Sequence, residues 1–395
     1  MKKILLIFGT RPEAIKMAPV VLRLKEAGRF QVEVAVTAQH REMLDQVLAL
    51  FGIVPDHDLD LMTPNQDLFD ITCRVLTGLK EVLGQERPDL VLVHGDTTTT
   101  MAAALAAFYL KIPVGHVEAG LRTRDKHRPY PEEANRHLTG VLADYHFAPT
   151  EWAKKNLLAE AVPPERIWVT GNTVIDALQL VASQVTGEAD VWEDYLARRY
   201  ALKLDGRRLL LVTGHRRENF GRPFENICLA LRDLMERRTD VHVVYPVHLN
   251  PNVQQPVFEI LAGSSSVSYG GEGAVHLKSP AGGCLTLLPP LAYAPFVFLM
   301  SKCHLVLTDS GGIQEEAPAL GKPALVMRDV TERPEGVWAG TVKLVGSDRQ
   351  QIYQGVSKLL DNPDHYQAMA QAQNPYGDGR AARQIVEIIQ GVLQS

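Results

Sequence analysis

Short apolar runs rich in β-branched residues alternate with helical patterns along most of the chain. The N-terminal half contains four such pairs: KILLIF and EAIKMAPVVLRLKE, VEVAVT and REMLDQVLALF, LVLVH and TTTTMAAALAAFYL, PVGHVE and PEEANRHLTGVLA. This alternation is typical of βαβ units, whose strands pair in parallel because each helix carries the chain back across the sheet. The sequence therefore predicts a doubly wound α/β fold.

The length of the chain indicates more than one domain. A single hydrophobic core usually stops growing at roughly 250 to 300 residues, and this chain has 395. The alternation restarts after the polar stretch GEADVWEDYLARRYALKLDGRR, with RLLLVTG as the next strand pattern. We expect two Rossmann-like domains, 1–172 and 173–378, that face each other across a cleft. The C-terminal helix, within 379–395, could dock on either domain, including back on the first.

Two apolar segments resemble export or membrane signals but do not fulfil their requirements. The start, MKKILLIF, has an apolar run of five residues, shorter than the ~7 to 15 of a signal peptide, so we interpret it as the first strand. Residues 281–300 carry no charge and approach the ~20 residues of a membrane span. Because Pro289 and Pro290 break this run, we expect no membrane span.

Charge and cysteine content narrow the partners and the compartment. The formal net charge of -5 offers no basic field for nucleic acid or an anionic membrane, so small-molecule or protein partners are expected. The scattered cysteines form neither a CxxC pair nor a local disulfide framework, which favours a reducing cytoplasm. They are Cys73, Cys228, Cys284 and Cys303.

The turn after the first strand reads GTRPE and is followed one turn later by Lys16. Arg11 and Lys16 would place two cations at a helix start, where free N–H groups and the helix dipole already favour an anion. A solvated helix start is the alternative. The turn lacks GxGxxG, and the chain lacks GxxxxGK[ST]. We therefore predict no dinucleotide cofactor and no P-loop.

Three carboxylates are expected at strand or helix ends that meet in one crevice of the first domain. Asp96 follows LVLVHG, Glu118 follows PVGHV, and Glu132 opens a helix at PEEANR. Close carboxylates can divide into an acid and a base, or they can bind Mg²⁺ or Ca²⁺. Surrounding positive charge favours acid/base chemistry over a metal site. These basic residues are Arg122, Arg124, His127, Arg128 and Arg136.

Similar strand ends in the second domain offer groups for an anion. His215 follows LLLVTG next to two arginines, and His248 follows VVYPV. In LVLTDSGGIQEEAPALG the small residues at 310–312 would let a diphosphate approach unpaired N–H groups, with Glu316 able to accept from ribose hydroxyls. A tight strand-to-helix turn without a ligand is the alternative.

A series of motifs running nearly end to end is similar to one family. GTRPE, HGDTTTT, GHVEAGLRT, PYPEEANR, GHRREN, YPVHLNPNV, TDSGGIQEEAP, RDVTERPEG and NPYGDG together resemble the non-hydrolysing UDP-N-acetylglucosamine (UDP-GlcNAc) 2-epimerases of bacteria. The resemblance implies the GT-B architecture, a homodimer, and neither metal nor nicotinamide. It also implies reversible conversion to UDP-N-acetylmannosamine (UDP-ManNAc) for cell-surface polysaccharide, by elimination of UDP to a bound 2-acetamidoglucal and re-addition.

The same resemblance assigns roles to individual residues. Acid/base and charge-stabilising roles fall to Asp96, Glu118 and Glu132, and a role at the diphosphate or in proton transfer falls to His215. The UDP-sugar contacts it implies are Arg11, Lys16, His248, Phe296, Ser310, Gly311, Gly312, Glu316 and Arg333. Some relatives bind a second, activating UDP-GlcNAc, and the residues similar to the parts involved are Gln39, His40, Gln46, Arg74 and Arg216.

One segment departs from the family pattern. Residues 263–290 are longer and richer in Gly, Ser and Pro than the usual connection, and LLPPLAY lacks its acidic residue. This departure makes Phe296 the least secure of the assigned contacts. Within the segment, SSSVSYGGEG at 264–273 predicts a flexible loop.

Other functions remain open alongside 2-epimerisation. A hydrolysing 2-epimerase would release free sugar and UDP, and a GT-B glycosyltransferase would transfer the sugar to an acceptor. A glycosyltransferase needs only one catalytic base and leaves the remaining carboxylates unexplained. A non-catalytic nucleotide-sugar sensor would need none of the acidic set.

Overall fold

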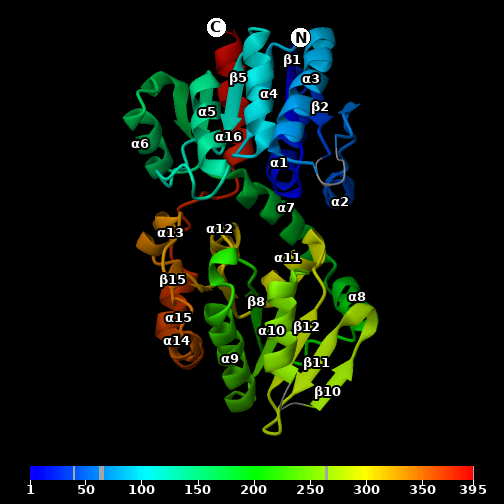
Figure 1. Ribbon diagram of the computed structural model, residues 1–395, viewed down its shortest axis with the longest axis vertical. Coiled ribbons are helices and arrows are strands. Elements are labelled where there is room, and N and C mark those ends of the chain that lie inside the picture. Colours follow the sequence, from blue (N-terminus) through cyan, green and yellow to red (C-terminus); the bar gives the residue numbers. More distant parts are fainter. Residues whose placement is uncertain (39–40, 62–65, 263–265, 395) are drawn as a thin grey trace. The chain divides into compact units, whose positions relative to one another are not determined.

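The structure is a computed structural model that describes residues 1–38, 41–61, 66–262 and 266–394. The chain folds into two compact units (Figure 1). Unit 1 comprises Met1–Gln179 and Tyr376–Ser395, and unit 2 comprises Leu180–Pro375. Each unit has its own mainly parallel sheet with helices, so the predicted fold class, two Rossmann-like units, is confirmed. Their facing across a cleft stays a prediction.

Within its described residues, unit 1 forms a seven-stranded parallel sheet in the order β3-β2-β1-β4-β5-β6-β7. The strands are β1 (Lys2–Phe8), β2 (Phe30–Val36), β3 (His57–Asp58), β4 (Leu90–His94), β5 (Val114–Val117), β6 (Tyr145–Ala148) and β7 (Ile167–Val169). The helices are α1 (Arg11–Ala27), α2 (Arg41–Leu50), α3 (Leu68–Glu86), α4 (Thr98–Tyr109), α5 (Glu132–Leu142), α6 (Glu151–Ala159), η1 (Pro164–Arg166) and α16 (Ala381–Gln394).

In the described part of unit 2 the sheet has eight strands in the order β10-β11-β12-β9-β8-β13-β14-β15. The strands are β8 (Arg208–Thr213), β9 (Val241–Pro246), β10 (Ser266–Tyr269), β11 (Val275–Lys278), β12 (Cys284–Leu288), β13 (Leu305–Thr308), β14 (Ala324–Val326) and β15 (Val342–Leu344). The helices are α8 (Ala189–Tyr200), η2 (Arg217–Asn219), α9 (Arg222–Arg237), α10 (Pro251–Ala262), η3 (Gly271–Gly273), α11 (Tyr293–Lys302), α12 (Ile313–Ala319), α13 (Pro334–Trp338), α14 (Arg349–Asp361) and α15 (Pro363–Ala370).

The strand orders place one switch point in each sheet. Strands β1 and β4 are neighbours in unit 1, and strands β8 and β13 are neighbours in unit 2, so the chain turns outward in both directions from these pairs. Ligands of doubly wound sheets bind outside the carboxyl ends of strands at such a point. The segments after β1, β4, β8 and β13 are therefore the places to look for a site.

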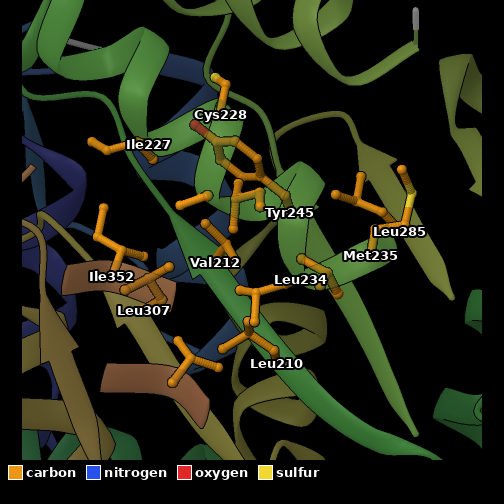
Figure 2. Packing of buried hydrophobic residues seen from close by; sticks show 14 of the residues in the cluster. Leu210, Val212, Ile227, Cys228, Leu234, Met235, Tyr245, Leu285, Leu307 and Ile352 are labelled. Atoms are coloured by element: carbon orange, nitrogen blue, oxygen red, sulfur yellow. The ribbon is translucent and has the colours of Figure 1, made fainter. Parts of the chain in front are cut away.

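Apolar side chains from strands and helices form the core of unit 2 (Figure 2). Leu210 and Val212 come from β8, Ile227 and Leu234 come from α9, and Tyr245 comes from β9. Such burial contributes about 1.5–3 kcal/mol per large apolar side chain. This packing holds β8, and with it the loop that follows β8, in a fixed place.

The segment that departs from the family pattern contains regular structure. The flexible loop predicted at 264–273 is wrong for the described residues 266–273, because β10 pairs antiparallel with β11 and η3 follows. Residues 264 and 265 lie outside the described residues. Strand β12 then pairs antiparallel with β11 and parallel with β9, so the segment extends the sheet at its edge. Residues 281–300 contribute β12 and α11, and no described helix is long and apolar enough to cross a membrane.

Helix α7 (Thr173–Gly187) begins where the sequence placed a helix start, near Asn172. The compact units divide within α7, whereas the expected boundary lies directly before it. At the other end of the chain, α16 returns to unit 1 and packs against α1. The carboxylate of Asp176 on α7 accepts hydrogen bonds from Ala381 N (3.1 Å) and Ala382 N (2.9 Å), which caps α16.

Replacing this cap should loosen α16. In Asp176→Ala the two buried N–H groups lose their acceptor, which costs about 1–3 kcal/mol, so amide exchange across 381–394 should rise roughly fivefold or more. Hydrogen exchange with mass spectrometry measures this directly. The control is Asp378→Ala, which removes an exposed carboxylate near the same helix and should leave the exchange unchanged. Equal exchange in the two variants would show that Asp176 does not hold α16.

Candidate active site

Glu118, directly after β5, lies in a buried cluster with a cation and an amide. Its Oε2 accepts from Lys16 Nζ on α1 and from Asn172 Nδ2 (2.7 Å). A Cβ on Gly95 would lie 3.6 Å from Glu118 Oε1, so the loop that carries Asp96 is its neighbour. Glu118 also has a φ of 62°, a left-handed conformation that is costly for a side chain with a Cβ. Such conformations concentrate at functional sites, because the surrounding structure must enforce them.

Asp96, which follows β4, is held by an arginine from α5. Its Oδ2 accepts from Arg136 Nη2 (2.6 Å) and Nε (3.0 Å), a two-pronged contact to one oxygen. The Asp96 carbonyl oxygen accepts from Asn135 Nδ2 (3.0 Å), on the same helix. The structure thus ties the β4 loop to the start of α5, where Glu132 lies. Asp96, Glu118 and α5 therefore belong to one region of unit 1.

The two glutamates that open α5 have different surroundings. Glu133 is buried and accepts from Thr123 N (3.0 Å), Arg124 N (2.8 Å) and Arg136 Nη1 (3.0 Å). Burial opposes its ionisation, but these bonds outweigh that effect and lower the pKa of Glu133. By contrast, Glu132 Oε2 is buried and has no hydrogen-bond partner in the described part of the chain. Glu133 therefore orders the basic loop, and Glu132 retains an open acceptor.

Two histidines beside this cluster are kept neutral. Burial lowers the pKa of His94 to about 4 and that of His116 to about 3. His94 Nε2 lies 3.9 Å from Glu118 Oε2, and His116 Nε2 lies 2.7 Å from Gly95 O. Because the His94 ring is neutral, it does not compete with Lys16 as the cation beside Glu118.

Metal-ligating side chains gather elsewhere in unit 1. Among the described residues, the group close enough to share an ion is Glu33, His57 and Glu86. Lys3 Nζ already pairs with Glu33 (3.1 Å) and Glu86 (2.5 Å). Lys3 belongs to the amino-terminal half of β1, whereas the site residues follow the carboxyl ends of the strands. The basic side chains that pair with the carboxylates of the site are Lys16, with Glu118, and Arg136, with Asp96.

In unit 2, Asp309 organises the loop after β8. This fully buried residue follows β13, and its carboxylate accepts from His215 N (2.9 Å), Arg216 N (2.8 Å) and Asn219 Nδ2 (3.2 Å). The His215 ring stacks on that of His248, with 5.3 Å between the ring centroids. The structure thus brings these two predicted histidines together and leaves the His215 side chain 41% exposed.

The glycine turn at 310–312 lies against an arginine. A Cβ on Gly311 would approach Arg333 Nη1 to 2.5 Å, so a larger residue would displace the guanidinium. Arg333 Nε donates to Glu315, and its Nη1 donates to Glu332 Oε1 (2.9 Å). Arg333 is nearly buried, at 9% exposed. The turn predicted for the diphosphate and the arginine predicted to contact UDP are therefore adjacent.

Glu316, predicted to accept from a ribose, already accepts from a tyrosine. Tyr293 Oη donates to Glu316 Oε1 at 2.7 Å. Burial, together with the neighbouring Glu316 charge, raises the pKa of Tyr293 well above its ordinary value, so the phenol stays a donor. One Glu316 oxygen is thereby oriented by α11. The half-buried Phe296 lies on the same helix, one turn further on.

The predicted activator residues are spread along unit 1 and unit 2. Gln46 is exposed on α2, and Arg74 Nη1 donates to Leu61 O (3.4 Å). Arg216 Nη2 lies 3.4 Å from Glu332 Oε1 in unit 2. Gln39 and His40 lie outside the described residues.

The residues that escaped the sequence analysis include Asn172, Tyr293, Asp309 and the buried Glu13 of α1, which accepts from Thr97 Oγ1 (2.7 Å). Asp309 carried a usable signal, because it directly follows a predicted strand as Asp96 nearly does. Asn172 lay at an expected helix start, and Glu13 lay within the quoted GTRPE motif. Nothing local marked Tyr293, whose partner Glu316 is 23 residues away.

Comparison with known proteins gives one family over nearly the whole chain. The family model described as UDP-N-acetylglucosamine 2-epimerase matches residues 22–390. The UDP-N-acetylglucosamine 2-epimerase of Escherichia coli (strain K12) is 57% identical over 387 residues, 98% of each chain.

Two solved structures are similar over the full length. The Neisseria meningitidis UDP-GlcNAc 2-epimerase bound to UDP-GlcNAc has a TM-score of 0.87 at 50% identity, covering 98% of this chain and 100% of that one. The Methanocaldococcus jannaschii enzyme in complex with UDP-GlcNAc and UDP has a TM-score of 0.78 at 32% identity, covering 98% and 99%.

The buried neutral histidines predict a pH dependence of stability. The unfolded chain protonates His116 below about pH 6.5, whereas the folded chain resists this down to about pH 3, so stability is present at pH 7 and falls with pH. We expect a loss of about 1–2 kcal/mol from this one group between pH 6.5 and 5. In His116→Gln, whose amide can replace the contact to Gly95 O, unit 1 should lose less stability over that range.

Pulsed hydrogen exchange of β4 and β5 peptides in a urea series measures the unfolding of unit 1 at each pH. His127→Gln, which changes an exposed histidine of the same unit, should keep the wild-type pH slope. An identical slope in His116→Gln would contradict a neutral buried His116.

Proposed function

The chain belongs to the UDP-N-acetylglucosamine 2-epimerase family, and we propose that it interconverts UDP-GlcNAc and UDP-ManNAc by inverting C2 of the sugar. The motif resemblance and the enzyme class expected from it are thereby confirmed. The elimination route, the residue roles and the biological use of the product are our further proposals.

The observation that carries the proposal is the pair of Glu118 with Lys16 at the end of β5. A carboxylate that accepts a proton from carbon must be ionised, and a positive group nearby must stabilise the negative charge that develops during the reaction. The Lys16 ammonium balances the charge of the Glu118 carboxylate. Lys16 projects from the first turns of α1, where an anion is also favoured. A substrate diphosphate would share Lys16 and so increase the basicity of Glu118.

We propose a two-step route. A carboxylate takes the C2 proton while the C1–O bond breaks, UDP leaves with the bonding electrons, and C1=C2 forms in 2-acetamidoglucal. UDP then adds back to C1 as C2 receives a proton on the opposite face. Asp96, Glu118 and Glu132 share the proton transfers and stabilise positive charge at C1. Glu132 is suited to acceptance, because no donor among the described residues occupies its Oε2.

UDP must stay bound between the two steps, and each unit offers groups for it. In unit 1 these are Arg11 and Lys16 at the start of α1. In unit 2 they are the 310–312 turn with Arg333, and Glu316 for the ribose hydroxyls. His215 and His248 stand after β8 and β9, where we assign them to the diphosphate or to proton transfer, and Phe296 to the uracil side.

We also infer a homodimer formed through α4 and α5. These helices pack side by side and leave large apolar side chains exposed. Isolated exposed apolar residues are common, but a group on neighbouring helices is typical of a protein interface. The exposed residues are Phe108 and Tyr109 of α4, and Leu138 and Val141 of α5.

The product would serve as a donor for cell-surface polysaccharide, which places the enzyme in the cytoplasm. The four cysteines agree with a reducing compartment, because all are free thiols in the structure.

Deuterium incorporation tests the activity. Pure protein incubated with UDP-GlcNAc in D₂O should produce UDP-ManNAc that carries deuterium at C2, and the recovered UDP-GlcNAc should gain it as well. Proton NMR of the C2 position measures both. Free N-acetylmannosamine with UDP would instead indicate a hydrolysing enzyme, and UDP release only with an added acceptor would indicate a glycosyltransferase. Absence of C2 exchange would overturn the proposal.

Isosteric variants test the carboxylates. Glu118→Gln and Asp96→Asn should each lower kcat about 100-fold or more, because general acid–base catalysis typically contributes 10²–10⁴-fold. The Kd for UDP, measured by calorimetry, should change less than about threefold, or about 0.7 kcal/mol, because both carboxylates are assigned to the sugar rather than to UDP. Glu151→Gln, at an exposed glutamate of α6, is the matched control. Loss of folding in both variants would make the two carboxylates structural.

A further inference from the structure

Glu13 is a buried carboxylate that joins two separate loops of unit 1. Its Oε2 accepts from the backbone N–H groups of Gly9 (3.2 Å) and Thr10 (2.8 Å), in the turn between β1 and α1. Its Oε1 lies 2.7 Å from Thr97 Oγ1 and 3.0 Å from Thr100 Oγ1, at the start of α4. The residue is 2% exposed, so protein groups surround the carboxylate.

A carboxylate fits this position because its two oxygens offer about four acceptor sites. The two N–H groups use one oxygen, and the Thr97 hydroxyl uses the other. Thr100 Oγ1 also lies 2.5 Å from His94 O, so its single proton has two acceptors. Burial raises the pKa of Glu13, and the hydrogen bonds from these donors counter part of that rise.

The turn between β1 and α1 is tightly packed. A Cβ on Gly9 would lie 2.0 Å from Thr37 Oγ1 and 2.9 Å from Thr99 Oγ1, so the β1–α1 turn is packed against its neighbours. The turn accepts glycine alone without displacing these hydroxyls. The β1–α1 turn therefore cannot shift freely to compensate for the loss of Glu13.

Both segments carry residues of the proposed site. Arg11 and Lys16 follow the β1–α1 turn, and Lys16 pairs with Glu118. Asp96 directly precedes Thr97 and pairs with Arg136. Strands β1 and β4 are neighbours at the switch point of the sheet, so Glu13 joins the two loops between which the ligand of such a sheet binds.

We propose that Glu13 is a positioning residue for epimerisation, because it fixes the cations of α1 relative to Asp96 in the β4 loop. The inference rests on the proposed function. Glu13 acts through Thr97 and the β1–α1 turn and touches no reacting atom. A misplacement of about 1 Å at a reacting group can cost roughly 100-fold in rate, so this placement is consequential.

Glu13→Asp tests the contact to Thr97 separately from the contacts to the β1–α1 turn. The shorter side chain keeps the charge and can still accept from Thr10 N, but it cannot reach Thr97 at the same time. We expect kcat for UDP-GlcNAc to fall about tenfold or more, as expected for a misplaced group, while the Kd for UDP changes less than about threefold. Glu26→Asp makes the same chemical change on the exposed face of α1 and is the control.

The split between kcat and Kd decides between positioning and simple helix capping. A wild-type kcat in Glu13→Asp would overturn the proposal. Parallel losses of kcat, UDP affinity and amide protection of α1 would also overturn it, because they would reduce Glu13 to the cap of that helix. If the wild-type protein itself does not exchange the C2 proton, the proposed function fails instead.

A double-mutant cycle keeps the connection testable without turnover. Thr97→Val removes the hydroxyl that donates to Glu13 Oε1. Amide exchange at the start of α4 is measured in Glu13→Asp, Thr97→Val and the double variant. We expect the increase in the double variant to be at least about threefold smaller than the product of the single increases, because the two changes break one contact. Multiplicative increases would show that Glu13 and Thr97 do not act together.

Discussion

In each unit one buried carboxylate joins the two segments that follow the strands of the switch point, and the rest of the site depends on this constraint. Loops at a switch point must turn away from the sheet, which leaves backbone N–H groups without strand partners. Glu13 accepts from two such groups after β1, and Asp309 accepts from two after β8. One ionisable acceptor satisfies several donors at once. The start of α1, which carries Lys16, and the loop that carries His215 thereby gain a defined geometry before any ligand arrives.

The charged pairs of the site follow the same logic. Lys16 with Glu118, Arg136 with Asp96, and Arg333 with Glu315 are all largely withdrawn from water. Such pairs add little to stability, because the cost of desolvation offsets much of their attraction. Their value lies in preorganisation: each carboxylate or guanidinium is held in place with its charge balanced. When a diphosphate binds, it can replace a carboxylate as the partner of a cationic side chain, so that no buried charge is left without a counter-charge.

The sequence predicted which residues follow the strands, but it did not predict which residues form long-range hydrogen bonds with each other. The alternation of apolar runs with helical patterns predicted both sheets. It also predicted that Asp96, Glu118 and His215 follow strands, as they do after β4, β5 and β8. Sequence could not reveal that Glu13 reaches Thr97, 84 residues away, or that Asp309 reaches His215, 94 residues away, because neither contact is local. The loop prediction was wrong for residues 266–273 for a related reason: β10 is a strand through its pairing with β11 rather than through its own polar sequence.

The proposed mechanism requires UDP to leave the sugar and to add back to it while both UDP and the 2-acetamidoglucal remain bound. Positional isotope exchange tests this most directly. UDP-GlcNAc is labelled with ¹⁸O at the oxygen that bridges C1 and the β-phosphorus, and ³¹P NMR follows the label during epimerisation. Elimination and re-addition predict that the label spreads to the non-bridging β-phosphate positions, because the freed phosphate can rotate. Epimerisation with the label retained at the bridge would contradict the account.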